Sequence, residues 1–342
     1  MPTKKRATLV ILCSVGFATL ASSRAALSQD DQPTDDGFAS IPLEDEAPVS
    51  RIRTPRPAPP ATEPTTAPTT EPAELEPLPY LSGDWNGQRR LLIDRGITLE
   101  ATATVEGTRN FTGGIRTGNT GQYLFNLYLT LDTEKLIDFK GGTFFVNFQN
   151  HGGESASGKT AGDWQWLSNI DARETTQVSE LWYQQSAFDG VIKLKVGKID
   201  AWSNFANCAY AVDFLGSGMG YPVSQTLLPT YPDPAVGAEL IFTPVEQFSA
   251  SVGVFDGSLQ EGALTGRLGP ANFWGDPSDL FLIAELGTTW KIESLSLPGG
   301  LFVGATYHTG TFEKFTRGTQ HGAAGAYMTL QQRLWREDPS VD

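Results

Sequence analysis

Hydrophobic and polar residues alternate with a period of two along much of the chain. In the run YLFNLYLTLDT, residues 123–133, the alternate positions that begin at Tyr123 carry Tyr, Phe and three Leu before the closing Thr. The positions between them are largely polar. Successive side chains of a strand point to opposite faces of its sheet, so this run predicts a strand with one apolar face.

The same alternation recurs, and it predicts ten strands. They cover residues 97–106, 123–133, 142–149, 176–186, 191–197, 235–243, 248–255, 280–291, 301–310 and 325–335. Their connections alternate between short turns and long loops. Short turns at one end and long loops at the other are the plan of an antiparallel transmembrane β-barrel of the outer-membrane porin type. We therefore predict an all-β fold.

The apolar face has two candidate neighbours. In a soluble β-sandwich it packs against a second sheet, and in a barrel it faces lipid. Many of the strands are near the 9–11 residues that cross a bilayer at a tilt, and the opposite face is hydrophilic and charged. Aromatic residues of the apolar face lie mostly toward strand ends, as in an interfacial belt: Tyr123, Tyr183, Trp290 and Tyr307. These features favour lipid, and a secreted soluble β-sandwich that binds carbohydrate remains the alternative.

Two segments precede the strands. Residues 1–25 contain a basic start and the apolar run ATLVILCSVGFATLA, which predicts a cleaved signal peptide and export. Residues 26–79 are acidic and rich in Pro and Thr, with 11 of the 22 prolines between Pro42 and Pro79. Such a composition cannot bury a core, so we predict a disordered spacer. Residues 80–342 then form the barrel domain.

The charge excludes one class of partner. The first 25 residues hold four basic residues and no acidic one, so their removal takes the net charge from −14 to −18. Nucleic-acid binding needs a basic face, and the sequence offers none.

The sequence also offers no catalytic or metal-binding pattern. There are three histidines, no G-x-S-x-G motif and no His or Cys cluster with ligand spacing. We predict that the protein is not an enzyme and has no metal and no cofactor.

The segment YLSGDWNGQRRLLIDRGITLEATATVEGTRNFTGGIRTG resembles the start of the OprB-type carbohydrate-selective porins. The matching residues are Gly83, Asp84, Trp85, Gly87, Arg89, Leu92, Arg95, Gly96, Gly113 and Gly114. Further blocks follow in the family's order, so the resemblance runs from about Leu81 to Glu337.

The resemblance implies a sixteen-stranded barrel in the outer membrane, trimeric or monomeric, in contact with lipid. It also implies passive diffusion of mono- and small oligosaccharides. Here the sequence ends at Asp342, just after the tenth predicted strand, so we expect that C-terminal strands of the family pattern are missing.

Strand parity predicts which side chains line the pore. A sugar-preferring channel needs polar groups that replace water on hydroxyls and rings that stack on the sugar face. The candidates are Glu100, Glu106, Asp132, Phe145, Glu180, Trp182, Lys193, Lys195, Glu239, Glu285, Tyr327 and Arg333, with Phe255 and Trp335 as weaker ones. The alternative for each charged candidate is that it only solvates a wide lumen. The alternative for each aromatic candidate is that it packs against an infolded loop.

The long loop 158–174 is the candidate constriction, because a loop with tryptophans can narrow a pore. Its candidate residues are Asp163, Trp164, Trp166, Asp171 and Arg173. An external lid or a trimer contact is the alternative reading of this loop. A general porin without sugar preference is a further alternative for the whole chain.

Overall fold

The computed structural model describes most of the predicted barrel domain. The described residues are 80–163, 166–208, 211, 214–216, 227–261, 263–268, 279–292, 297–314 and 316–335, together with the backbone of 10–18. The predicted spacer 26–79 and most of the predicted signal segment lie outside them, so both stay predictions.

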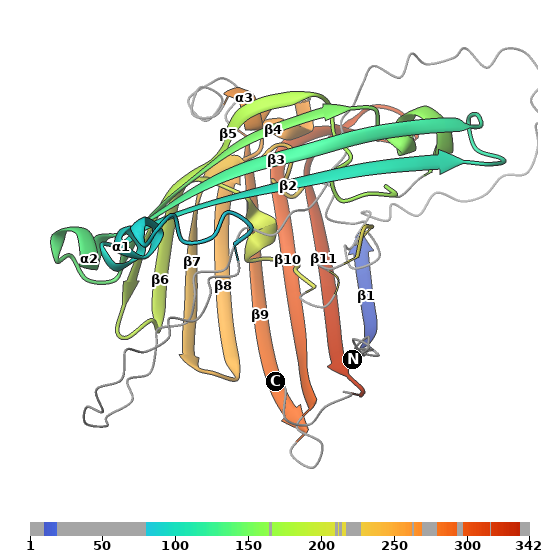
Figure 1. Ribbon diagram of the computed structural model, residues 1–342. Coiled ribbons are helices and arrows are strands. Elements are labelled where there is room, and N and C mark those ends of the chain that lie inside the picture. The colour runs from blue at the N-terminus through green and yellow to red at the C-terminus, as the bar shows by residue number, and fades with distance from the viewer. Residues whose placement is uncertain are drawn as a thin grey trace, which may run out of the picture.

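Ten consecutive antiparallel strands form one curved sheet, in the order β2 to β11 (Figure 1). Their bounds are β2 Ile97–Asn110, β3 Gly118–Asp132, β4 Gly142–Gly153, β5 Thr175–Ala187, β6 Ile192–Ile199, β7 Ala235–Val245, β8 Phe248–Asp256, β9 Leu280–Ile292, β10 Leu297–Glu313 and β11 Thr319–Arg333. The all-β antiparallel prediction is confirmed, with the strand count and order that the alternation indicated. Several strands are longer than predicted, because they continue beyond the alternating run.

The sheet is not closed within the described residues. β2 pairs with β3 alone, and the other edge is formed by β1, Val10–Ala18, which pairs antiparallel with β11. β1 comes from the apolar run that predicts a signal peptide. Its backbone therefore lies along the edge of β11, and cleavage of this segment stays a prediction.

The described residues also contain short helices, before β2 and between the strands. They are α1 Gln88–Asp94, α2 Thr133–Ile137, η1 Ser157–Ala161, η2 Ala201–Ser203, η5 Ser258–Glu261 and α3 Thr265–Leu268. Among the described helices none has the length and apolar character needed to cross a membrane.

The two faces of the sheet have opposite chemistry. On the outer face, large apolar side chains are exposed: Leu99, Leu127, Val178, Leu194, Leu240, Val252, Leu286, Val303 and Leu330 are examples. On the inner face, polar side chains are buried, and Asn126, Glu180 and Glu239 are each at most 2% exposed. A soluble protein has the reverse arrangement, so the outer face is suited to hydrocarbon.

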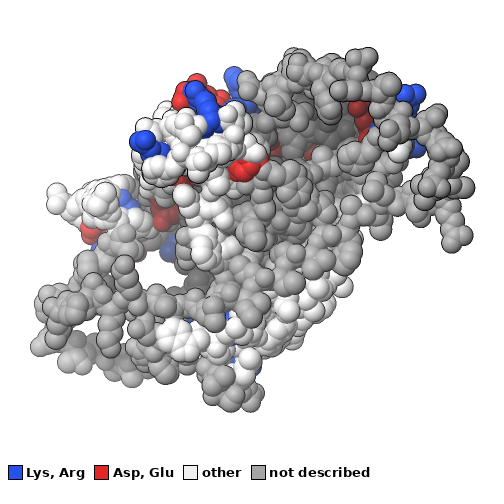
Figure 2. All heavy atoms as spheres, turned by 90° about the vertical axis from the view of Figure 1, so that its right-hand side faces the viewer, with Lys and Arg blue, Asp and Glu red and all other residues white. Residues whose placement is uncertain are grey.

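The described strands form a single sheet, not two sheets packed face to face. The β-sandwich alternative needs a second sheet over the apolar face. Figure 2 shows acidic and basic side chains gathered mainly toward the upper edge of the view, and most of the other described surface is uncharged.

A β-bulge changes which residues of β5 point inward. The register between β4 and β5 shifts after the Asn147–Glu180 pair, so that Phe148 pairs with Val178. Ser179 is the extra residue, and it is buried together with Glu180. Parity therefore reverses across Ser179, which puts Gln177 and Glu180 on the same inner face.

The GDWNGQRR block packs as a compact cap before β2. The guanidinium of Arg89, 5% exposed, lies between the rings of Tyr80 and Trp85, at 4.0 and 4.1 Å from their centroids. Gly96 lies between α1 and β2 with φ +86°, and a Cβ there would lie 2.8 Å from the carbonyl oxygen of Asp132. The close approach of two backbones requires glycine at this position.

A charge on the outer face should destabilise the folded protein in lipid. Val252 lies in the middle of β8 and is half exposed on that face. We expect Val252→Arg to lower the free energy of unfolding in lipid vesicles by about 2–4 kcal/mol, because the guanidinium loses its water. The control is Thr288→Arg on the same face near the turn, with an expected loss of about 0–1 kcal/mol. Equal stability of wild type and Val252→Arg would contradict a lipid-facing wall.

Candidate pore interior

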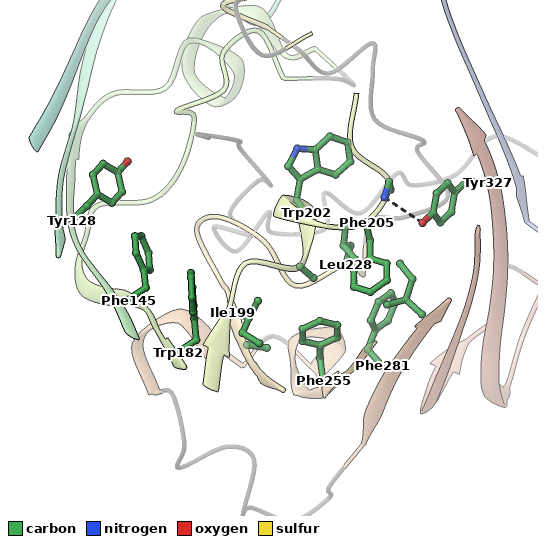
Figure 3. Close-up of a cluster of buried hydrophobic side chains, with 14 residues drawn as sticks. Tyr128, Phe145, Trp182, Ile199, Trp202, Phe205, Leu228, Phe255, Phe281 and Tyr327 are labelled. Carbon is green, nitrogen blue, oxygen red and sulfur yellow. Dashed lines mark hydrogen bonds between the residues drawn. The ribbon is translucent and has the colours of Figure 1, made fainter. Parts of the chain in front are cut away.

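The loop between β6 and β7, residues 200–234, is here called the lumen loop, and its described parts, residues 200–208, 211, 214–216 and 227–234, include side chains that pack on the inner face of the sheet. Its described apolar side chains include Trp202, Phe205 and Leu228, and Phe205 and Leu228 are fully buried. In Figure 3 these three lie between wall side chains that run from Tyr128 on one side to Tyr327 on the other. The lumen loop therefore fills the centre of the curved sheet.

The wall side of this cluster is aromatic. Tyr128, Phe145 and Trp182 come from β3, β4 and β5 and stack in a row, with ring centroids 6.0 and 4.8 Å apart. Lys195 on β6 extends the row, because its Nζ lies 4.6 Å from the centroid of Trp182. Farther along the wall, Phe255 meets Phe205 of the lumen loop edge to face at 6.5 Å.

Hydrogen bonds fix the first residues of the lumen loop to both sides of the wall. Asp200 directly follows β6, and its carboxylate accepts the N–H of Trp202 at 3.0 Å. Six residues on, the N–H of Ala206 donates to Glu285 on β9 at 2.8 Å. The hydroxyl of Tyr327 on β11 donates to the same carboxylate at 2.6 Å. Because the loop is anchored to β9 and β11 as well as to β6, it spans the inner face.

A ladder of amide side chains crosses the inner face from β2 to β5. Asn126 donates to Thr102 at 3.4 Å and accepts from Gln149 at 2.9 Å. Gln177 continues the ladder by donating to Gln149 at 3.2 Å and to the carbonyl oxygen of Pro232 at 2.8 Å. The ladder therefore ends on the lumen loop.

The loop between β4 and β5, residues 154–174, also folds inward. The carboxylate of Asp171 is fully buried, and it accepts from Gln122 on β3 and from Ser157, each at 2.6 Å. Glu106 on β2 accepts from Gln122 at 3.1 Å and from Ser168 at 2.5 Å. These bonds tie the loop to the wall at β2 and β3.

A buried ion pair joins the two loops. Both guanidinium NH groups of Arg173 contact the two carboxylate oxygens of Asp233, at 2.7 and 2.6 Å. Gly266 of α3 donates to the same carboxylate, and Thr265 donates to the carbonyl oxygen of Asp233. Three loops therefore meet at Asp233.

The structure places most predicted wall residues on the inner face, under the loops. Buried there are Phe145, Glu180, Trp182, Lys195, Glu239, Phe255, Glu285 and Tyr327. Glu100, Glu106, Lys193 and Arg333 are partly exposed.

The carboxylate of Asp132 caps α2 at the short-turn end, where it accepts from the N–H groups of Glu134 and Lys135. Trp335 is 47% exposed and lies beyond the end of β11. A sugar-contact role stays a prediction for all the predicted wall residues.

The residues predicted for the constriction loop also differ in burial. Asp171 and Arg173 belong to the buried contacts above, and Asp163 accepts from Ser157 at 2.9 Å. Trp166 is partly exposed, and Trp164 lies outside the described residues.

The sequence prediction did not select the lumen loop as the element that fills the interior. A connection of about 30 residues with Trp202, Phe205 and Leu228 was the available signal, because loops above about 12–15 residues are usually functional.

Burial has an electrostatic cost at the start of the lumen loop. Burial raises the pKa of Asp200 to about 6, although its hydrogen bonds to the N–H groups of Trp202 and Tyr231 and the charge of Lys195 oppose the shift. Burial therefore disfavours the ionised form of this carboxylate.

The comparisons agree with this architecture. The family model described as "Carbohydrate-selective porin, OprB family" matches residues 118–342. The chain belongs to this family. The block at residues 81–114, which carries the first resemblance, lies before the matched region.

Two relatives place this family member among known proteins. The chain is 27% identical to Porin B of Pseudomonas aeruginosa over 169 residues, which are 44% of this chain and 37% of that protein. Its fold is similar to the high pH structure of Pseudomonas putida OprB, with a TM-score of 0.63 and 19% identity, covering 75% of this chain and 66% of that one. The chain therefore spans a little over a third of the first protein and about two thirds of the second.

Removal of the ion pair between the loops should loosen them. Arg173 and Asp233 are mostly buried, with side chains 17% and 7% exposed. We expect Arg173→Ala to destabilise the protein by about 3–5 kcal/mol, because Asp233 is left as a buried unpaired charge. Hydrogen exchange of the amides in residues 227–235 measures the loosening.

The matched control is Arg90→Ala, which breaks the more exposed pair with Asp84, whose side chains are 26% and 28% exposed. We expect a loss of about 0–1 kcal/mol for this variant. Equal losses in the two variants would show that the Arg173–Asp233 pair does not hold the loops.

Proposed function

We propose that the chain forms an outer-membrane channel for passive, carbohydrate-preferring diffusion of mono- and small oligosaccharides. One observation carries this proposal. This chain belongs to the carbohydrate-selective porin family, and it has apolar side chains exposed on the outer face and polar side chains buried on the inner face. Lipid on one side and a polar path on the other account for both faces.

The inner face has the two chemistries that a sugar needs. Hydroxyl groups exchange their water for side chains that both donate and accept, and the ladder of Asn126, Gln149 and Gln177 is of that kind. The row of Tyr128, Phe145 and Trp182 has ring faces of the kind that stack on a sugar. Like the ladder, the row is buried under the loops, so the partly exposed wall groups are the ones within reach of a passing solute. Permeation also requires weak binding, so that the sugar leaves as readily as it enters.

The lumen loop determines the width of the path in this proposal. Its buried side chains occupy the centre of the sheet, so a sugar passes along the wall beside the loop. The charged wall candidates that remain partly exposed are the groups most accessible to a passing solute: Glu100, Glu106, Lys193 and Arg333.

Export through a cleaved signal peptide and residence in the outer membrane follow from the same proposal. The exposed apolar side chains on every strand from β2 to β11 support lipid as the outer partner. A homotrimer is the oligomer that the family resemblance suggests. A general porin without sugar preference is the second candidate, because charged side chains line both the buried and the partly exposed wall.

Conductance in planar bilayers tests the proposal. We expect sugar to reduce the ion current of the full chain, and liposomes to swell faster with a monosaccharide than with a non-sugar solute of equal size. Equal swelling rates and a current that does not respond to sugar would support the general porin instead.

The double variant Trp202→Ala, Phe205→Ala should widen the path, because it removes two large rings from the centre of the loop. We expect a higher ion conductance and a smaller difference between sugar and non-sugar solutes. Leu286→Ala is the matched control, since this side chain is 58% exposed on the outer face. An unchanged conductance in the double variant would show that the lumen loop does not set the width.

A further inference from the structure

A small polar cavity lies where the lumen loop meets the wall at β3, β4 and β5. Its volume is about 10 Å³, which is the space of a single water molecule or ion. The lining residues are Asn126, Tyr128, Asn147, Gln149, Ser179, Glu180, Asp200, Tyr231 and Pro234. Two of them, Glu180 and Asp200, are buried carboxylates.

The two carboxylates are close to each other. Glu180 accepts the indole N–H of Trp182 at 3.1 Å and the backbone N–H of Asp200 at 3.4 Å. Asp200 in turn accepts from the backbone of Trp202. Both carboxylates therefore border one cavity and are separated by a single backbone group.

The positive groups around this cavity are already engaged. The Nζ of Lys195 lies 3.5 Å from Glu239, and Arg173 is paired with Asp233. Lys198 donates to the backbone carbonyls of Val178 and Gly266. Lys195 and Lys198 are therefore the nearby cations, and each also has another partner, so neither is devoted to the Glu180 and Asp200 carboxylates.

A neutral side chain provides an independent indication of an occupant. Asn147 is 4% exposed and lines the cavity, and its Oδ1 has no hydrogen-bond donor among the described residues. Its amide nitrogen donates to Asn126 at 3.3 Å. An acceptor buried without a donor is costly, so this oxygen requires a partner inside the cavity.

We propose that this cavity binds one hard metal cation, Ca²⁺ or Na⁺, through oxygen atoms of Glu180, Asp200 and Asn147, with Ser179 beside them. Oxygen is the ligand that such cations prefer, and carboxylates with an amide oxygen are a usual donor set. The described residues hold no cluster of three or more His, Cys, Asp or Glu, and here the amide and hydroxyl oxygens complete a site that has two carboxylates. The sequence predicted no metal, because these residues are far apart in the chain.

The cation would fasten the lumen loop to the wall, because Asp200 belongs to the loop and Glu180 and Asn147 belong to β5 and β4. This inference does not depend on the transported solute, so its failure leaves the proposed function unaffected, and the reverse also holds.

Terbium luminescence tests the site in the full chain in detergent. Tb³⁺ replaces Ca²⁺ at oxygen sites, and Trp182 lies next to Glu180, so excitation of tryptophan should give terbium emission that saturates with one ion per chain. Ca²⁺ should displace Tb³⁺ if the site is divalent. If the site takes Na⁺, Na⁺ should displace it and choline should not.

Variants locate the ion. We expect Glu180→Gln to weaken Tb³⁺ binding at least about tenfold. Trp182→Phe should reduce the emission while the stabilisation by the cation remains, because the oxygen ligands are unchanged. Glu285→Gln is the matched control, since this carboxylate is also buried on the wall but binds the lumen loop at Ala206. It should bind Tb³⁺ as the wild type does.

The melting temperature provides a readout that needs no variant. At equal ionic strength, the wild type should melt at a higher temperature in Ca²⁺ or in Na⁺ than in choline. A water molecule in the cavity would give the same melting temperature in all three salts and no saturable emission, which would overturn the proposal. Emission that Glu180→Gln and Trp182→Phe both leave unchanged would place the ion elsewhere and overturn it as well.

Discussion

The structure depends on the pairing of every inner strand with two neighbours in one curved sheet. In hydrocarbon no water is present to bind a free backbone N–H or C=O, so each must bond to an adjacent strand. That pairing in turn fixes the two faces, because side chains alternate along each strand. Leu127 and Val252 are therefore on the outer face for the same reason that Asn126 and Ser251 are on the inner one.

A curved sheet with a polar inner face leaves a space that has to be occupied. The lumen loop occupies it with apolar side chains in the middle and hydrogen-bonded contacts at the ends. Trp202 and Phe205 pack against the aromatic wall, whereas Ala206 and Pro232 bond to Glu285 and Gln177. The polar contacts determine where the loop lies, because hydrogen bonds are directional and apolar contacts are not.

The period-two pattern predicted the fold closely, since strand faces follow directly from sequence. Glu180, Glu239, Glu285 and Tyr327 are buried on the inner face to which the pattern assigns them, and their role as pore-lining residues stays a prediction. The pattern could not show that they lie beneath a loop, because Trp202, Phe205 and Leu228 belong to an irregular segment whose position depends on contacts distant in sequence. The role of Asp132 was also out of reach, because the last residue of a strand is equally suited to cap the following helix.

The anchoring of the lumen loop has a consequence for selectivity. A sugar loses water on entering a narrow polar path, and only groups already held in position can replace that water without a further cost in conformational entropy. The amide ladder is held by its own hydrogen bonds and by Pro232, and the loop is held to the wall at Asp200 and Ala206 and to the loop after β4 at Asp233. In the proposed channel, a loop fixed at three places would keep the path at one width, so discrimination between solutes would rest on static geometry and would not require the loop to move.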